Sequence, residues 1–161
     1  MKDKKLLFTA QAALIAAVYV ALTVVFAPIS FGEIQVRISE ALTILPIFTP
    51  AAVPGLFIGC LIGNFLGGAV VPDIIMGSIA TLLGALGTRF LRDRSPFVAI
   101  IPPIIANALI VPFVLRYAYQ VDLPIPLMML TVGAGEVLSC GVLGLLLYYA
   151  VEPHKENIFR A

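Results

Sequence analysis

The chain has 161 residues, of which 61% are hydrophobic and 12% charged, and its formal net charge is +1. Its mean hydropathy is +1.08. A water-soluble core of this length needs far less apolar material, so the composition excludes an ordinary soluble domain and indicates a chain that faces lipid.

Long stretches without charge predict helices that cross a membrane. The clearest run from Leu6 to Ala27, Val53 to Val71, Ile74 to Thr88 and Pro96 to Leu115, and most approach the roughly 20 residues that a spanning helix needs. Two weaker candidates carry an acid each, Glu40 and Glu136. We therefore expect one all-α transmembrane domain over residues 1–161, a bundle of about six helices with approximate spans 6–27, 36–50, 53–70, 73–91, 96–117 and 124–151. The first span exceeds a signal-peptide core and is expected to stay in the mature protein.

The distribution of basic residues predicts the orientation of these spans. Eight of the ten lysines and arginines fall on one side of the proposed membrane: Lys2, Lys4, Lys5, Arg89, Arg92, Arg94, Lys155 and Arg160. Arg37 and Arg116 fall on the other side. Cytoplasmic loops carry the excess of positive charge, so both termini are expected in the cytoplasm.

Motifs for catalysis, for nucleotide binding and for metal binding are missing from the sequence. There is no His-Glu-x-x-His, no Gly-x-Ser-x-Gly and no Gly-x-x-x-x-Gly-Lys-Ser/Thr loop. The single histidine, His154, lies in the charged C-terminal tail. Cys60 and Cys140 lie inside apolar spans, which favours small buried side chains over a disulfide. We expect no enzyme activity, no cofactor and no metal.

Polar residues inside apolar spans are the main functional signal, because each is costly in lipid unless it faces a partner in the protein interior. The six candidates are Arg37, Glu40, Asn64, Asp73, Asn107 and Glu136. The predicted topology places the first four toward the outer leaflet and the last two near mid-membrane. Three acids against one base favour a cationic ligand or one rich in hydrogen-bond donors.

Structural roles are the alternative interpretation of the same residues. Arg37 and Glu40 are three positions apart and can pair with each other. Asp73 follows a proline at a helix start, where a carboxylate caps free amides. The two asparagines can join helices by hydrogen bonds. Glu136 has no base within a helical turn, which leaves pairing with a distant arginine or protonation.

Small residues mark two of the predicted helices. Ala13, Ala17 and Ala21 recur at intervals of four in the first span and form a smooth stripe. Such a stripe lets helix backbones approach closely, either within the bundle or against another protein. The glycines of the third span favour close packing within the bundle.

Two consecutive segments resemble a known family. They are Pro28–Pro46, PISFGEIQVRISEALTILP, and Phe48–Cys60, FTPAAVPGLFIGC. Together they resemble the QueT family of queuosine-precursor transporters, and the likeness extends over essentially the whole chain. The resemblance implies the substrate-binding S component of an energy-coupling factor (ECF) transporter in the bacterial cytoplasmic membrane. It implies as partners an ECF transmembrane subunit, docked on the alanine stripe, and two ATP-binding subunits.

The implied ligand is a 7-deazaguanine base, whose ring and exocyclic N–H groups suit a carboxylate acceptor. The six polar residues are the candidate substrate-binding set, with Gln35 as a further donor. Aromatic faces for stacking are available from Phe31, Phe65, Tyr117 or Tyr119. No nucleic-acid partner is expected. The alternatives are a self-contained secondary carrier for a polar or cationic solute, driven by protons through Glu136 or Glu40, and an intramembrane enzyme.

Overall fold

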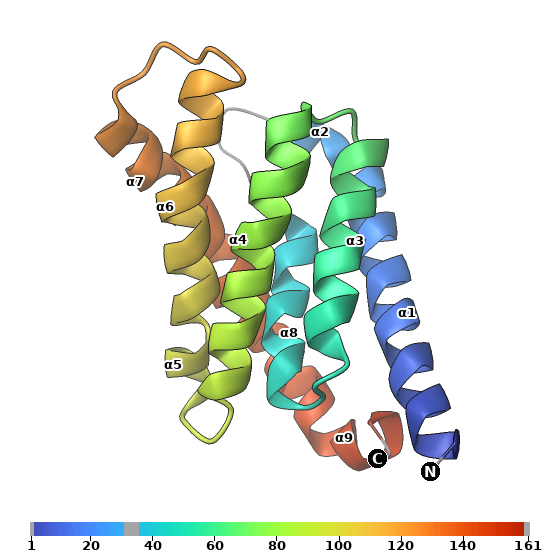
Figure 1. Ribbon diagram of the computed structural model, residues 1–161. Helices are drawn as coiled ribbons and strands as arrows, with labels where there is room; N and C mark the ends of the chain where they lie inside the picture. The colour runs from blue at the N-terminus through green and yellow to red at the C-terminus, as the bar shows by residue number, and fades with distance from the viewer. Residues whose placement is uncertain (1, 31–35, 160–161) are drawn as a thin grey trace.

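The computed structural model describes residues 2–30 and 36–159, and every regular element in these ranges is helical. Along the chain these elements are α1 (Lys2–Val25), α2 (Ala27–Ser30), the 3-10 helix η1 (Ile38–Ile47), α3 (Ala52–Leu66), α4 (Val71–Phe90), α5 (Pro96–Ala99), α6 (Ile101–Tyr117), α7 (Ile125–Glu136), the π-helical η2 (Val137–Leu143), α8 (Gly144–Val151), η3 (Glu152–His154) and α9 (Lys155–Ile158). The long helices lie side by side in one bundle (Figure 1). The predicted all-α class is confirmed.

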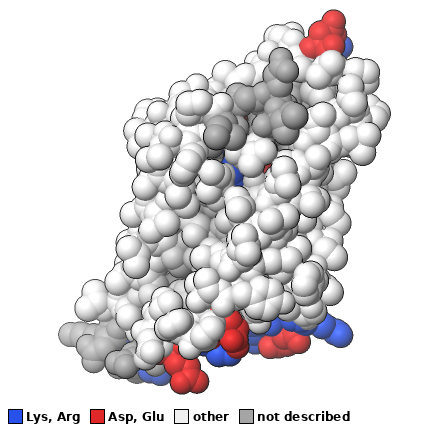
Figure 2. All heavy atoms as spheres, turned by 180° about the vertical axis from the view of Figure 1, so that it is seen from behind, with Lys and Arg blue, Asp and Glu red and all other residues white. Residues whose placement is uncertain are grey.

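Several of these helices are long and apolar enough to cross a membrane. Four such stretches occur in the described residues: Lys4–Val25, Val71–Phe90, Pro96–Tyr117 and Ile125–Ile158. The shorter η1 and α3 are also apolar. Uncharged side chains cover most of the surface seen in Figure 2, and charged groups gather mainly at one end. The predicted multi-pass membrane protein is confirmed.

The two ends of the bundle differ in charge as the sequence predicts. Both termini and the loop between α4 and α5, which carries Arg92 and Arg94, lie at one end of the bundle (Figure 1). The α3–α4 and α6–α7 connections lie at the opposite end. The end with the termini is the basic one, and the charge rule predicts that this end faces the cytoplasm.

The second apolar segment forms a short helix in the middle of the bundle. η1 has 10 residues, and Ser39 through Pro46 are buried. A 3-10 helix rises about 2.0 Å per residue, so η1 covers about 20 Å of the roughly 30 Å hydrocarbon layer. It occupies the half of the bundle nearer the termini (the cyan helix in Figure 1). Its first residues, including Glu40, therefore lie deep inside the protein.

Glycines allow α1 and α3 to pack with their backbones in contact. A Cβ at Gly55 would lie 2.7 Å from the carbonyl oxygen of Ala12, and one at Gly59 would lie 2.8 Å from Cβ of Tyr19. The expected close packing of the third span is therefore confirmed. The inner face of α1 is taken by this contact, and Ala13, Ala17 and Ala21 are exposed on its outer face.

A similar contact joins α4 to α6. A Cβ at Gly84 would lie 2.6 Å from Cα of Pro103, and one at Gly87 would lie 2.4 Å from Cβ of Pro102. The prolines stand in the first turn of α6, where a missing backbone N–H costs nothing. The glycines of one helix thus receive the proline rings of the other.

Candidate functional site

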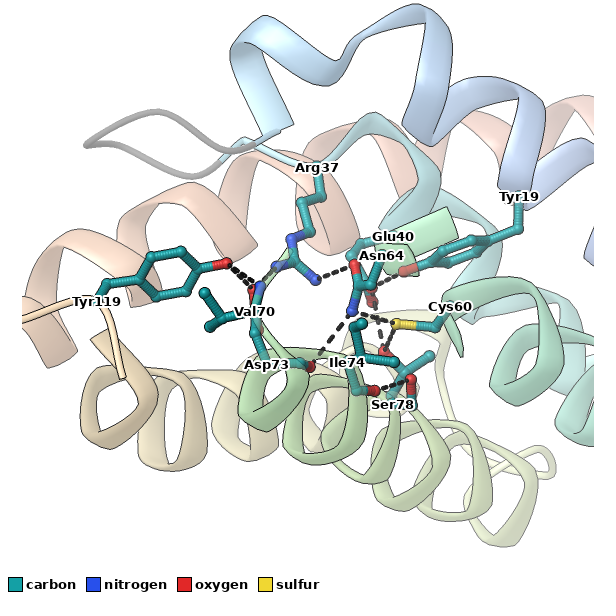
Figure 3. A network of polar contacts seen from close by, with 11 residues as sticks. Tyr19, Arg37, Glu40, Cys60, Asn64, Val70, Asp73, Ile74, Ser78 and Tyr119 are labelled. Carbon is teal, nitrogen blue, oxygen red and sulfur yellow. Dashed lines mark hydrogen bonds and ion pairs between the residues drawn. The ribbon is translucent and has the colours of Figure 1, made fainter. Parts of the chain in front are cut away.

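A buried ion pair joins η1 to α4 on the side away from the termini. Nη2 of Arg37 lies 3.5 Å from Oδ2 of Asp73. Asn64, on α3, accepts a hydrogen bond from Nη1 of Arg37 at 3.4 Å. The hydroxyl of Tyr119 donates to Oδ2 of Asp73 at 2.9 Å. Figure 3 shows these four side chains converging from four different parts of the chain.

Glu40 is the centre of a second set of contacts. Its side chain is 0% exposed. Oε1 accepts hydrogen bonds from the hydroxyl of Tyr19 on α1 and from Oγ1 of Thr81 on α4, the latter at 3.2 Å. Oε2 has no hydrogen-bond partner among the described residues. One carboxylate oxygen is therefore held by two hydrogen bonds, and the other can accept a hydrogen bond from a further donor.

Glu136 lies at the end of α7, where the helix widens into the π-helical η2. Such segments redirect side chains and often occur at functional sites. Sγ of Cys140, in this segment, donates a hydrogen bond to Oε2 of Glu136 at 3.1 Å. One ligand atom each of Glu40, Glu136 and Cys140 lie within 4.8 Å of one another. The side chain of Asn107, on α6, lies beside the Glu136 carboxylate.

Cys60 connects the ion pair to the Glu40 contacts. Nδ2 of Asn64 donates to Sγ of Cys60 at 3.5 Å, and Oγ1 of Thr81 approaches the same sulfur at 3.4 Å. The structure thus brings all six sequence-predicted polar residues into one buried network. Each is at most 3% exposed: Arg37, Glu40, Asn64, Asp73, Asn107 and Glu136.

The capping interpretation of Asp73 does not hold. The N-cap of α4 is Val70, and no side-chain hydrogen bond caps this helix. Asp73 stands in the first turn, where its charge favours the helix dipole. Its carboxylate accepts from Tyr119 and pairs with Arg37 instead.

Several members of the network carry no clear sequence signal. Tyr19 and Thr81 hold Glu40, but single hydroxyl groups are common in apolar helices. Cys60 and Cys140 are buried and free of disulfides, as expected. Their sulfurs nevertheless contact polar groups, so the two cysteines take part in the polar network as well as in core packing. The sequence pattern that could have indicated such a partner is a polar residue one helical turn from a buried acid, as Cys140 is from Glu136.

Of the candidate stacking residues that the structure describes, one lies in the network and two do not. Tyr119 joins the network through Asp73. Phe65 and Tyr117 are 70% and 68% exposed, so they face away from it. Phe31 and Gln35 lie outside the described residues. A hollow of about 140 Å³ lies elsewhere, at the terminal end, lined by Lys4, Leu7, Phe8, Gln11, Phe48, Thr49, Pro50 and Phe159.

A multi-pass bundle with a charged network sealed in its interior is the arrangement of a membrane protein that handles a polar solute. The chain belongs to the QueT transporter family, whose model, described as QueT transporter, matches residues 9–153. It is 39% identical over 85 residues to the queuosine precursor transporter QueT of Lactococcus lactis subsp. cremoris (strain MG1363). That match covers 52% of this chain and 50% of the relative, so the chain spans about half the length of the curated relative it matches. No solved structure matches the chain.

Proposed function

We propose that the chain binds a queuosine precursor, a 7-deazaguanine base, from the outer side of the cell membrane. We propose further that it acts as the substrate-binding S component of an ECF-type importer, as one transmembrane domain over residues 1–161. The observation that carries the proposal is the buried network of six polar side chains in a chain of the QueT transporter family.

The chemistry of the network suits such a base. A 7-deazaguanine offers N–H donors along one edge and a carbonyl acceptor beside them. The Glu40 and Glu136 carboxylates are acceptors for N–H groups of the ligand, and charge-assisted hydrogen bonds of this kind are the strong ones. Arg37, Asn64 and Asn107 supply donors for the carbonyl oxygen. All of these groups are closed to solvent in this structure, so binding requires the outer end to open.

The source of energy is expected to lie in partner subunits. The sequence contains no phosphate-binding loop that would hold ATP. Ala13, Ala17 and Ala21 form a smooth exposed stripe on α1, whose opposite face is already packed on α3. A helix of an ECF transmembrane subunit can approach closely along such a stripe, and two ATP-binding subunits would then drive transport.

Reconstitution distinguishes this proposal from a self-contained carrier. The purified chain is placed in liposomes alone, or with the ECF transmembrane and ATP-binding subunits, and uptake of a radiolabelled 7-deazaguanine is followed. The proposal predicts uptake only with partners and internal ATP. Uptake by the chain alone under a proton gradient would favour the carrier, and recovery of a chemically altered product would favour an enzyme.

A further inference from the structure

Two acids face each other in the middle of the network. Ligand atoms of Glu40, Glu136 and Cys140 lie within 4.8 Å of one another, and both acids are at most 3% exposed. Two carboxylates this close, shielded from water, cannot both carry a negative charge unless a positive charge lies with them. The pair therefore needs a proton or a cation.

The surrounding residues do not supply enough positive charge. Arg37 is the one buried base among the side chains that the structure describes, and it lies 3.5 Å from Asp73. One guanidinium thus serves three carboxylates. The segment 31–35 reads FGEIQ and contains no base. The other titratable groups around the pair are uncharged or acidic: Tyr19 from α1, Cys60 from α3, Asp73 from α4 and Cys140 from η2.

One buried polar atom at the pair, Oε2 of Glu40, lacks a hydrogen-bond partner among the residues that the structure describes. Its residue is 0% exposed. Buried polar groups are nearly always paired, so an open acceptor next to an uncompensated acid pair indicates a polar ligand.

We propose that Glu40 and Glu136 form a cation subsite, in which a ligand ammonium group replaces a proton shared by the two carboxylates. This inference rests on the proposed function and adds which precursors bind tightly: those that carry a positively charged substituent. In the empty site the pair holds one proton and a charge of minus one. When R–NH₃⁺ binds, its N–H groups donate to the carboxylates and the proton leaves to the solvent. The net charge of the subsite is unchanged.

A matched pair of ligands tests the subsite on the full-length wild-type chain. The probes are 7-aminomethyl-7-deazaguanine and its neutral 7-hydroxymethyl counterpart, titrated by calorimetry at pH 7 in two buffers with different heats of protonation. We expect the ammonium ligand to bind about tenfold tighter or more, with release of about one proton. The hydroxymethyl ligand should release none.

Glu40→Gln and Glu136→Gln should each abolish the difference between the two ligands, and either variant suffices if the other fails to fold. Asp122→Asn, on a side chain that is 96% exposed, is the matched control and should keep the difference. Equal affinities without proton release would overturn the subsite and leave the proposed function intact. Binding of neither ligand would overturn the proposed function and the subsite with it. A stoichiometric divalent metal that the ammonium ligand does not displace would identify a metal site instead.

Discussion

Arg37 and Asp73 form a buried ion pair, with Nη2 of the arginine 3.5 Å from Oδ2 of the aspartate. The pair ties the start of the central helix η1 to the first turn of α4. Both side chains are almost fully buried. If one partner is lost, water therefore cannot solvate the charged group that remains.

We expect the stability of the chain to depend strongly, and non-additively, on Arg37 and Asp73. Arg37→Met leaves the Asp73 carboxylate buried without its base, and we expect it to destabilise the chain by about 3–5 kcal/mol. Adding Asp73→Asn should recover part of the loss, because the uncompensated charge is then removed. Thermal unfolding of the two single variants and the double variant in detergent measures this coupling. Strictly additive losses would show that the two residues act independently.

Tyr119 should make stability depend on pH in the alkaline range only. Burial, and then the neighbouring Asp73 carboxylate, raises the pKa of Tyr119 to about 12. The folded state thus favours the protonated hydroxyl, which donates to Asp73. The contribution is complete below the unfolded pKa of about 10 and is lost as the pH rises toward 12.

Comparison of the free energies of unfolding of the wild-type chain and Tyr119→Phe measures the contribution of the Tyr119 hydroxyl to stability. The stability difference between them should be constant from pH 6 to about pH 9 and shrink above about pH 10. Tyr117→Phe, on a side chain that is 68% exposed, serves as the control and should have little effect. A difference that vanishes already near neutral pH would contradict the hydrogen bond to Asp73.

Gly84 should tolerate no side chain. A Cβ there would lie 2.6 Å from Cα of Pro103, and a proline backbone in a helix cannot easily move. Gly84→Ala should therefore destabilise the chain by about 1–3 kcal/mol through overpacking. Gly133→Ala is the matched control, because its Cβ would meet nothing closer than Cβ of Ala108 at 3.7 Å. Equal melting temperatures for the two variants would show that α4 and α6 are less tightly packed.

A substitution at Ala17 tests the proposed docking of a partner helix on the exposed alanine stripe Ala13, Ala17 and Ala21. Because it is exposed on the outer face of α1, Ala17→Phe should leave folding and ligand affinity nearly unchanged but exclude a partner helix. Copurification with the ECF transmembrane subunit should fail, while Leu146→Phe, at another exposed position, should not affect it. Normal assembly of the Ala17 variant would remove the stripe from the interface. Loss of ligand binding by the isolated variant would point to internal packing.

The sequence predicts the bundle well because lipid imposes simple rules on it. Apolar length marks the spans, basic residues mark one end, and polar residues in apolar helices mark the interior. The partners of those polar residues are less predictable. That Tyr19 and Thr81 meet on one oxygen of Glu40 depends on how three helices are rotated about their axes.

Two local departures from α-helix geometry are also invisible in the sequence. The 3-10 form of η1 lets its 10 residues cover about 20 Å, where an α-helix of the same number of residues would cover about 15 Å. The π-helical turn after Glu136 shifts the helical register of everything that follows it. Both segments are mostly apolar, so hydrophobic periodicity does not distinguish them from ordinary α-helix.

Calorimetric titration of the purified chain with a 7-deazaguanine base shows whether the buried network is a binding site for that ligand. We expect saturable one-to-one binding by the wild-type chain. Glu136→Gln keeps the shape of the side chain but removes a charge-assisted acceptor worth roughly 1.5–3 kcal/mol, so its dissociation constant should rise about tenfold to a few hundredfold. Binding with an unchanged dissociation constant in both Glu136→Gln and Glu40→Gln, or no binding by the folded wild-type chain, would show that the network does not bind this base.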